Sequence, residues 1–199
     1  MKYDVILAGV GGQGVLSVAS IIARAALAQG FEVRQSEVHG MAQRGGAVLS
    51  HMRIADEKIS GDLVPKGSAD LIISMEPLES LRYVSYLKPS GALVTSAEPF
   101  LNIGNYPDLG EIHSAVKQLP LWRIVEASAL AKEAGLAKAA NMVMVGAASY
   151  FLPVKTQILE KTITEVFFFF YAVAAEANVK AFNLGQKAVK VQNSKENKK

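Results

Sequence analysis

The chain has 199 residues, half of them apolar and a fifth charged, so it can bury one sizeable core and does not require a second domain. It contains no cysteine, which excludes disulfides, cysteine-ligated zinc and cysteine-ligated iron–sulfur clusters on this chain. The formal charge of +3 comes largely from lysines near the C-terminus, so we expect a nearly neutral body and no nucleic-acid partner.

The sequence carries no signal for export or for a membrane. Its first residues enter an apolar strand pattern without a charged n-region or a small-residue cleavage site, so we expect a cytoplasmic protein. The most hydrophobic stretch, residues 166–175 with four consecutive Phe, is far shorter than the roughly 20 residues that span a bilayer. We expect no membrane association and interpret the stretch as a buried helix or an interface.

Strands and helices alternate along the first half of the chain. The apolar pattern predicts strands at residues 3–8, 31–36, 47–54 and 70–75, and helices at 15–29 and 77–87. Pro77 suits the first position of a helix, and the turn Pro89-Ser90-Gly91 should lead into a further strand at 92–96. The long loop between the second and third strands is a candidate functional loop, because binding residues concentrate on such loops.

The second half adds one more strand and several helices. We expect the strand at 122–127 and helical segments at 111–118, 128–133, 141–152, 156–175 and 178–191. This order favours an α/β fold with three layers, a Rossmann-like domain with a largely parallel sheet covered on both faces and a helical C-terminal segment. Residues 1–191 should form one domain, and the polar residues 192–199 should be disordered, because they offer no apolar surface to offset chain entropy.

A glycine-rich loop follows the first strand and reads Gly9-Val10-Gly11-Gly12-Gln13-Gly14. Between a strand and a helix this G-x-G-x-x-G pattern presents backbone N–H groups that can hold an anion. Glu37, just past the second strand, stands where an acidic residue could bind a ribose hydroxyl. Two interpretations stay open: an NAD-dependent dehydrogenase, and a tight turn in which glycines let strand and helix pack closely. The first requires a catalytic acid or base in a substrate domain, yet the histidines are scattered and no such domain follows.

A second loop combines one imidazole, one guanidinium and several glycines. It reads Glu37-Val38-His39-Gly40-Met41-Ala42-Gln43-Arg44-Gly45-Gly46. This composition suits the close approach of backbone and charge to a polar partner. A solvated turn without a function is the alternative.

Taken together, the two loops resemble those of the small subunits of 2-oxoacid:ferredoxin oxidoreductases, the gamma subunit or domain of that family. The resemblance continues through Val64-Pro65-Lys66-Gly67-Ser68-Ala69-Asp70, through Ser74-Met75-Glu76-Pro77-Leu78-Glu79-Ser80-Leu81-Arg82-Tyr83 and at Asn141-Met142-Val143. Further matching positions are Gly146, Asn178, Ala181, Phe182 and Gly185, whereas the Phe-rich stretch has no counterpart. The His-Gly-Met-x-Gln-Arg and Glu-Pro-x-Glu-x-Leu-Arg-Tyr runs are typical of the indolepyruvate branch.

The resemblance implies a subunit of an enzyme that oxidatively decarboxylates indolepyruvate or another aryl pyruvate to the acyl-CoA, with ferredoxin as electron acceptor. It also implies that thiamine diphosphate, Mg²⁺ and iron–sulfur clusters reside on a large alpha subunit, with coenzyme A as co-substrate. The sequence agrees, since it lacks Cys and a Gly-Asp-Gly run with a following Asn. We therefore expect residues 1–191 to be one gamma-type domain that binds no cofactor, holds no metal and has no activity alone.

The resemblance also selects candidate site residues, none of them catalytic. For contact with a coenzyme A phosphate or with a carboxylate of the partner we expect Gly9, Gly11, Gly12, Gln13, Gly14, Arg44 and Gly45. For the interface we expect Glu37, His39, Met41 and Glu76. His39 could instead only fix its own loop, and Glu76, with Glu79, could complement a helix dipole. Two other functions stay open: a freestanding NAD-type oxidoreductase, and a gamma subunit for pyruvate or 2-oxoglutarate.

Overall fold

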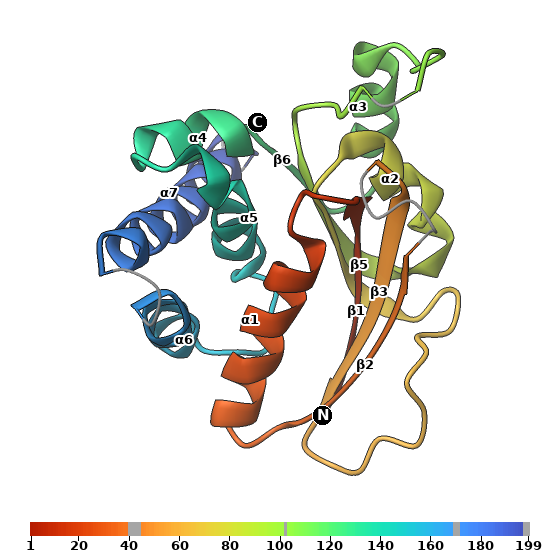
Figure 1. Ribbon diagram of the computed structural model, residues 1–199. Coiled ribbons are helices and arrows are strands. Elements are labelled where there is room, and N and C mark those ends of the chain that lie inside the picture. Colours follow the sequence, from red (N-terminus) through yellow and green to blue (C-terminus); the bar gives the residue numbers. More distant parts are fainter. Residues whose placement is uncertain (40–44, 102, 169–171, 197–199) are drawn as a thin grey trace.

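The computed structural model describes residues 1–39, 45–101, 103–168 and 172–196. A six-stranded sheet in the order β2-β3-β1-β4-β5-β6 stands between two layers of helices (Figure 1). The strands are β1 (Lys2–Val10), β2 (Glu32–His39), β3 (Ala47–Ala55), β4 (Ala69–Ser74), β5 (Leu87–Ser96) and β6 (Trp122–Val125). The predicted three-layer α/β domain is confirmed.

Helices cover both faces of this sheet, and the strands divide their side chains between the two sides. The helices are α1 (Val15–Ala28), α2 (Pro77–Arg82), α3 (Leu109–Lys117), α4 (Ala127–Glu133), α5 (Ala140–Ala148), α6 (Thr156–Phe168) and α7 (Ala172–Glu196), with 3₁₀ turns η1 (Val84–Tyr86) and η2 (Ala137–Ala139). Val5 and Leu7 of β1 join the large core beneath α1, α5, α6 and α7, whereas Ile6 joins a smaller core on the side of α2 and α3 (Figure 1). The alternation follows from the two-residue period of a strand.

One strand departs from the parallel arrangement. The pairs β1–β4, β4–β5 and β5–β6 are parallel, but β3 pairs antiparallel with both β1 and β2. Only seven residues lie between the end of β2 and the start of β3, fewer than the dozen or more that a parallel crossover connection needs, so the two strands pair antiparallel. In the sheet, β3 and not β2 lies beside β1.

The predicted turn at residues 89–91 is wrong, because this segment belongs to β5. The register between β4 and β5 shifts there, with Ala69 opposite Leu87 and Leu71 opposite Ala92. Such a bulge leaves Pro89 outside the ladder, where its missing N–H costs nothing. The preceding helix is also shorter than predicted, since α2 ends at Arg82 and η1 follows.

The C-terminal helices differ in their limits from the prediction. The single helix expected at 156–175 is divided into α6, which ends at Phe168, and α7, which begins at Ala172. Phe167 packs against the large core and Phe168 is 65% exposed, while residues 169–171 lie outside the described ones. Helix α7 runs to Glu196, and the division into a domain and a polar tail stays a prediction. No described helix is long and apolar enough to cross a bilayer.

His51 of β3 supplies a prediction about stability. Its ring is buried, its Nδ1 accepts the N–H of Val64 at 3.2 Å, and it packs edge-on against Tyr86. Burial lowers the pKa of His51 below its ordinary value. The folded state therefore resists protonation of this ring, so its contribution to stability is complete above the unfolded pKa of about 6.5 and declines as the pH falls below it.

Urea unfolding at pH 7.5 and pH 5.5 measures this decline. We expect the wild-type chain to lose more free energy of unfolding between these pH values than the variant His51→Gln, whose amide does not titrate. Equal losses in the two proteins would show that His51 is not responsible.

Candidate functional site

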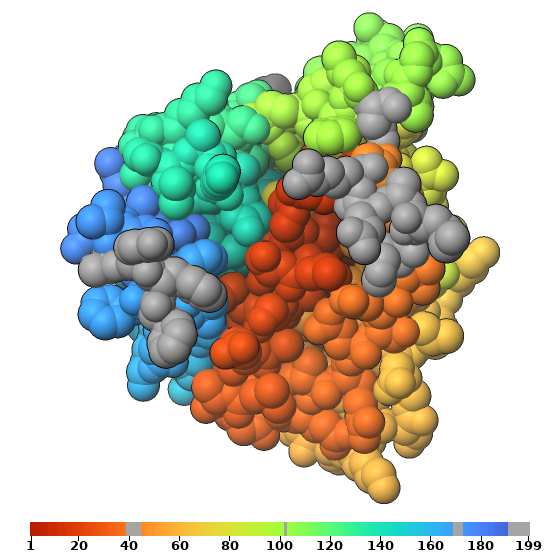
Figure 2. Space-filling view, in the orientation of Figure 1, coloured from red at the N-terminus to blue at the C-terminus, as the bar shows by residue number. Residues whose placement is uncertain are grey.

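A cleft of about 560 Å³ opens at the carboxyl end of the sheet. It lies where β1 continues into α1 on one face and β4 continues into α2 on the other, which is where ligands bind in open α/β sheets. Its walls come from the glycine loop, from the segment after β5 and from the starts of α4 and α5, which meet in Figure 2. Among the lining residues are Gly12, Gly14, Met75, Phe100, Lys138 and Asn141.

The glycine loop has a defined backbone geometry. Gly12 and Gly14 have φ angles of 102° and 82°, in the left-handed region that favours glycine. Gly14 is the N-cap of α1, and its carbonyl accepts the N–H of Val18 at 3.1 Å. Among the described residues, the N–H groups of Gly12 and Gly14 donate to no protein acceptor. The loop can therefore offer backbone donors to an anion in the cleft.

Close packing leaves little room for a side chain at position 9 or at position 14. A Cβ on Gly9 would lie 2.8 Å from Cγ2 of Val15 and 3.0 Å from Cβ of Met75. A Cβ on Gly14 would lie 2.9 Å from Nδ2 of Asn141. The interpretation of the motif as a tight turn is thus confirmed, because Gly9 lets strand and helix approach while Gly12 and Gly14 shape the turn. Contact of these glycines with an anion stays a prediction.

Gln13 connects the glycine loop to the end of β4. Its side-chain oxygen accepts the N–H of Val10 at 2.8 Å, and its amide nitrogen donates to the carbonyl of Met75 at 3.2 Å. Both ends of the amide are therefore engaged within the protein. The geometry makes Gln13 a support of the loop, and its predicted contact with an anion stays a prediction.

The structure brings the two predicted loops together. The N–H of Gly11 donates to the carbonyl of Gly46 at 2.8 Å, and the N–H of Gly45 donates to the carbonyl of Gly11 at 3.2 Å. These bonds continue the β1–β3 ladder beyond Val10. Gly45 therefore contacts the glycine loop, with which the sequence analysis groups it. The contact of both with an anion stays a prediction.

Other residues of the second loop are placed only in part. The backbone of His39 pairs with Val48, but its side chain lies outside the described part, as do Met41 and Arg44. Glu37 is exposed on β2, opposite Ser50. Because β3 separates β2 from β1, Glu37 is two strand spacings, roughly 10 Å, from β1. The predicted position for a ribose hydroxyl is therefore wrong, since that contact needs an acid on the strand beside β1.

Glu76 is a buried helix cap. It is 1% exposed, and its Oε2 accepts the N–H of Glu79 at 2.8 Å at the start of α2. Its Oε1 accepts the N–H of Phe100 at 3.3 Å and the hydroxyl of Tyr106. Burial, and then this carboxylate, raise the pKa of Tyr106, so its hydroxyl remains a donor at neutral pH. The helix-start alternative for Glu76 is confirmed, and its interface role stays a prediction.

Its neighbour Glu79 is buried as well but has a basic partner. Nε of Arg82 lies 3.1 Å from Oε2 of Glu79, one turn along α2. Burial raises the pKa of Glu79, and the guanidinium of Arg82 opposes that rise.

Several lining residues were not among the predicted site residues. Phe100 follows β5, and Lys138 lies on η2, in a stretch for which the sequence predicts no element. Asn141 belongs to the run Asn141-Met142-Val143, which resembles the family. This resemblance was the one feature of the sequence that could have marked Asn141 as a site residue. The lining thus combines the ammonium group of Lys138 and the apolar side chains of Met75 and Phe100 with the carboxylate of Glu98, which already accepts the N–H of Ser128 and the hydroxyl of Ser96.

A resident cofactor can be tested against these residues. The chain has no Cys and so does not fit a cysteine-ligated iron–sulfur cluster. In the described ranges, no group of three or more His, Asp or Glu side chains is placed to hold a metal ion. The glycine loop and Lys138 offer the cleft backbone N–H donors and one positive charge, groups that can bind an anion.

Comparison with known proteins matches the chain with one family. Residues 4–188 match the family described as pyruvate ferredoxin/flavodoxin oxidoreductase. The chain is 38% identical to indolepyruvate oxidoreductase subunit IorB of Pyrococcus horikoshii, over 95% of this chain and 96% of that relative. It is 31% identical to 2-oxoglutarate synthase subunit KorC of Methanothermobacter marburgensis, over 74% of this chain and 76% of that one.

Solved structures share the fold. The gamma subunit of a keto/oxoacid ferredoxin oxidoreductase from Geobacter sulfurreducens is 25% identical, with a TM-score of 0.68 over 95% of this chain and 99% of that one. A 2-oxoglutarate:ferredoxin oxidoreductase from Magnetococcus marinus, solved with 2-oxoglutarate, coenzyme A and succinyl-CoA, gives a TM-score of 0.76 at 22% identity. The match covers 96% of this chain but 31% of that longer one, and shows likeness of fold.

Proposed function

This chain belongs to the pyruvate ferredoxin/flavodoxin oxidoreductase family, and we propose that it is the small subunit of an indolepyruvate-oxidising 2-oxoacid oxidoreductase complex. The observation that carries the proposal is the identity of 37–38% with relatives named subunit IorB, over about 95% of the chain. The relatives named KorC are less similar, which ranks 2-oxoglutarate behind indolepyruvate as the substrate. Pyruvate remains a third substrate to be compared by assay.

The proposal divides the work between two subunits. The large subunit holds thiamine diphosphate, Mg²⁺ and the iron–sulfur clusters, decarboxylates the aryl pyruvate and passes electrons to ferredoxin. This chain cannot hold the clusters, since it has no Cys. It is inactive alone and completes the enzyme by association.

The contribution of this chain lies at the cleft. Among the described residues the N–H groups of Gly12 and Gly14 donate to no protein acceptor, so they are available to an anion, and Lys138 in the cleft lining adds a positive charge. Helix α1 has no acidic residue in its first turn, which leaves its positive end uncompensated. We propose that this wall, with Gly45 and Arg44, binds a phosphate of coenzyme A or a carboxylate of the large subunit.

Co-expression with the large subunit tests the proposal. We expect the two chains to purify together and to catalyse coenzyme A-dependent reduction of a viologen dye by indolepyruvate, whereas each chain alone is inactive. Phenylpyruvate should also react, and pyruvate and 2-oxoglutarate should react much more slowly. Failure of the chains to associate would overturn the proposal, and faster turnover of 2-oxoglutarate would reassign the substrate.

The same assay examines the anion contact. In the joint complex Arg44→Ala should raise the KM for coenzyme A, or weaken assembly, by about tenfold or more, as expected for one charge-assisted hydrogen bond. Arg34→Ala is the matched control, because this exposed side chain on β2 pairs only weakly with Glu32 at 3.3 Å. Unchanged kinetics and assembly for Arg44→Ala would refute the contact.

A further inference from the structure

One wall of the cleft is formed by residues 97–101, which we call the rim segment. It follows β5 and contributes Glu98, Pro99 and Phe100 to the cleft. Its first half is held firmly. The N–H of Ala97 donates to the carbonyl of Val125 at 2.8 Å, and the carboxylate of Glu98 accepts the N–H of Ser128 at 2.8 Å.

The second half of the rim segment makes one hydrogen bond to the rest of the described residues. The N–H of Phe100 donates to Oε1 of Glu76, and Tyr106 donates its hydroxyl to the same oxygen from beyond the segment. Phe100 itself is partly exposed in the cleft wall, and Leu101 is 73% exposed. Glu76 therefore holds Phe100 by a hydrogen bond of 3.3 Å.

The choice of glutamate at this helix cap supports a role beyond capping. Ser, Thr, Asp and Asn are the favoured N-caps, because their short side chains reach the first free N–H groups of a helix. The longer side chain of Glu76 caps α2 with one oxygen and extends the other to Phe100 and Tyr106. In the described part of the chain no basic side chain pairs with this carboxylate, although burial of a charge without such a partner is costly.

We propose that Glu76 is a positioning residue that joins the start of α2 to the rim segment and so sets the width of the cleft. Glu76 and Phe100 are 24 positions apart, and among the described residues this carboxylate joins them by a hydrogen bond. The identification of coenzyme A as the ligand that enters the cleft rests on the proposed function. The connection itself rests on the geometry alone.

Two variants separate the connection from the helix cap. Glu76→Asp retains a favoured cap but is one methylene too short to reach Phe100 and Tyr106. Tyr106→Phe removes one donor and leaves the cap untouched. Tyr150→Phe is the matched control, since Tyr150 lies on the surface after α5 and away from the cleft.

The absence of cysteine allows a direct measurement of cleft width. Ser96→Cys is nearly isosteric and places one thiol at a buried position that lines the cleft. It removes the bonds between the Ser96 hydroxyl and Glu98, but equally in every protein compared. In the full-length chain with this thiol, Glu76→Asp and Tyr106→Phe should accelerate its reaction with a bulky maleimide at least threefold, and Tyr150→Phe should not. Equal labelling rates in all four proteins would overturn the inference.

Kinetics of the joint complex provide the second measurement. Without the added thiol, Glu76→Asp and Tyr106→Phe should raise the KM for coenzyme A at least threefold while kcat stays within twofold, a split that simple loss of folded protein does not produce. An unchanged KM beside faster labelling would overturn the link between the rim segment and ligand binding. If the wild-type complex showed no coenzyme A-dependent activity, the proposed function would be wrong. The labelling rates would still test the role of Glu76.

Discussion

Replacing Gly185 with alanine should lower the free energy of unfolding by about 3 kcal/mol, the upper range for overpacking a closed core. A Cβ on Gly185 would lie 2.0 Å from the carbonyl oxygen of Val143 in α5, and one on Gly146 would lie 1.9 Å from that of Phe182 in α7. The backbones of α5 and α7 therefore touch at these two glycines. Since a carbonyl group cannot rotate away as a side chain can, the helices must separate to admit a methyl group. Urea unfolding followed by circular dichroism measures the loss.

The paired variant provides an internal check. Gly146→Ala and Gly185→Ala both force the same two helices apart, so the double variant should lose less than the sum of the single losses. Gly104→Ala is the matched control, because a Cβ there meets no atom of the described residues within 4 Å. A loss below about 1 kcal/mol for Gly185→Ala would show that α7 can shift on α5 without cost.

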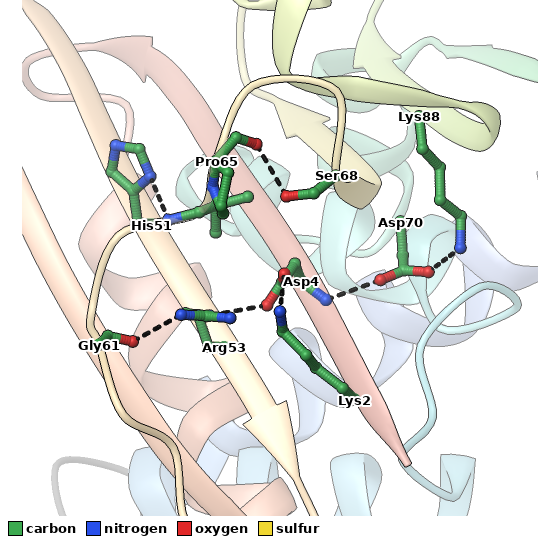
Figure 3. A network of polar contacts seen from close by, with 10 residues as sticks. Lys2, Asp4, His51, Arg53, Gly61, Pro65, Ser68, Asp70 and Lys88 are labelled. Carbon is green, nitrogen blue, oxygen red and sulfur yellow. Dashed lines mark hydrogen bonds and ion pairs between the residues drawn. The ribbon is translucent and has the colours of Figure 1, made fainter.

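Asp4→Asn should destabilise the fold by about 3 kcal/mol, as removal of one member of a buried ion pair does. The side chain of Asp4 is 3% exposed, and its Oδ1 accepts Nε of Arg53 at 3.0 Å (Figure 3). Arg53 is 12% exposed and also donates to the carbonyl of Gly61 at 2.9 Å. Asparagine keeps the shape of Asp4 but leaves this guanidinium without its countercharge.

Asp4 is part of a larger network of polar contacts. The N–H of Asp4 donates to Asp70 at 2.8 Å, and Asp70 pairs with Lys88, so β1, β3, β4 and β5 are joined at this end of the sheet (Figure 3). Urea unfolding of Asp4→Asn should be compared with Glu165→Gln, which breaks an exposed pair on α6 and should change stability little. Adding Arg53→Met to Asp4→Asn should recover part of the loss, because no buried charge then remains unpaired. No recovery would contradict the assigned cause.

Much of the fold follows from local patterns in the sequence. The apolar run of β1, the Gly9 to Gly14 loop and the Ala-rich α1 are neighbours in the chain, so backbone sterics and side-chain period are enough to predict them. The cap at Glu76 next to Pro77 was one of two predicted alternatives for the same reason. The turn at 89–91 failed because proline and glycine suit both a turn and a bulge, and only the pairing partner decides between them.

From the sequence alone the order of the six strands, a tight turn as one of two interpretations of the glycine loop and, through the resemblance, the family could be predicted, because each of these depends on short runs of neighbouring residues. The tertiary structure alone decided that β3 separates Glu37 from β1, that Gly45 bonds to Gly11, and that Phe100 and Lys138 face the same cleft. These relations join residues that are tens of positions apart. Strand order, register and layer packing bring them together, and no local pattern records those long-range choices.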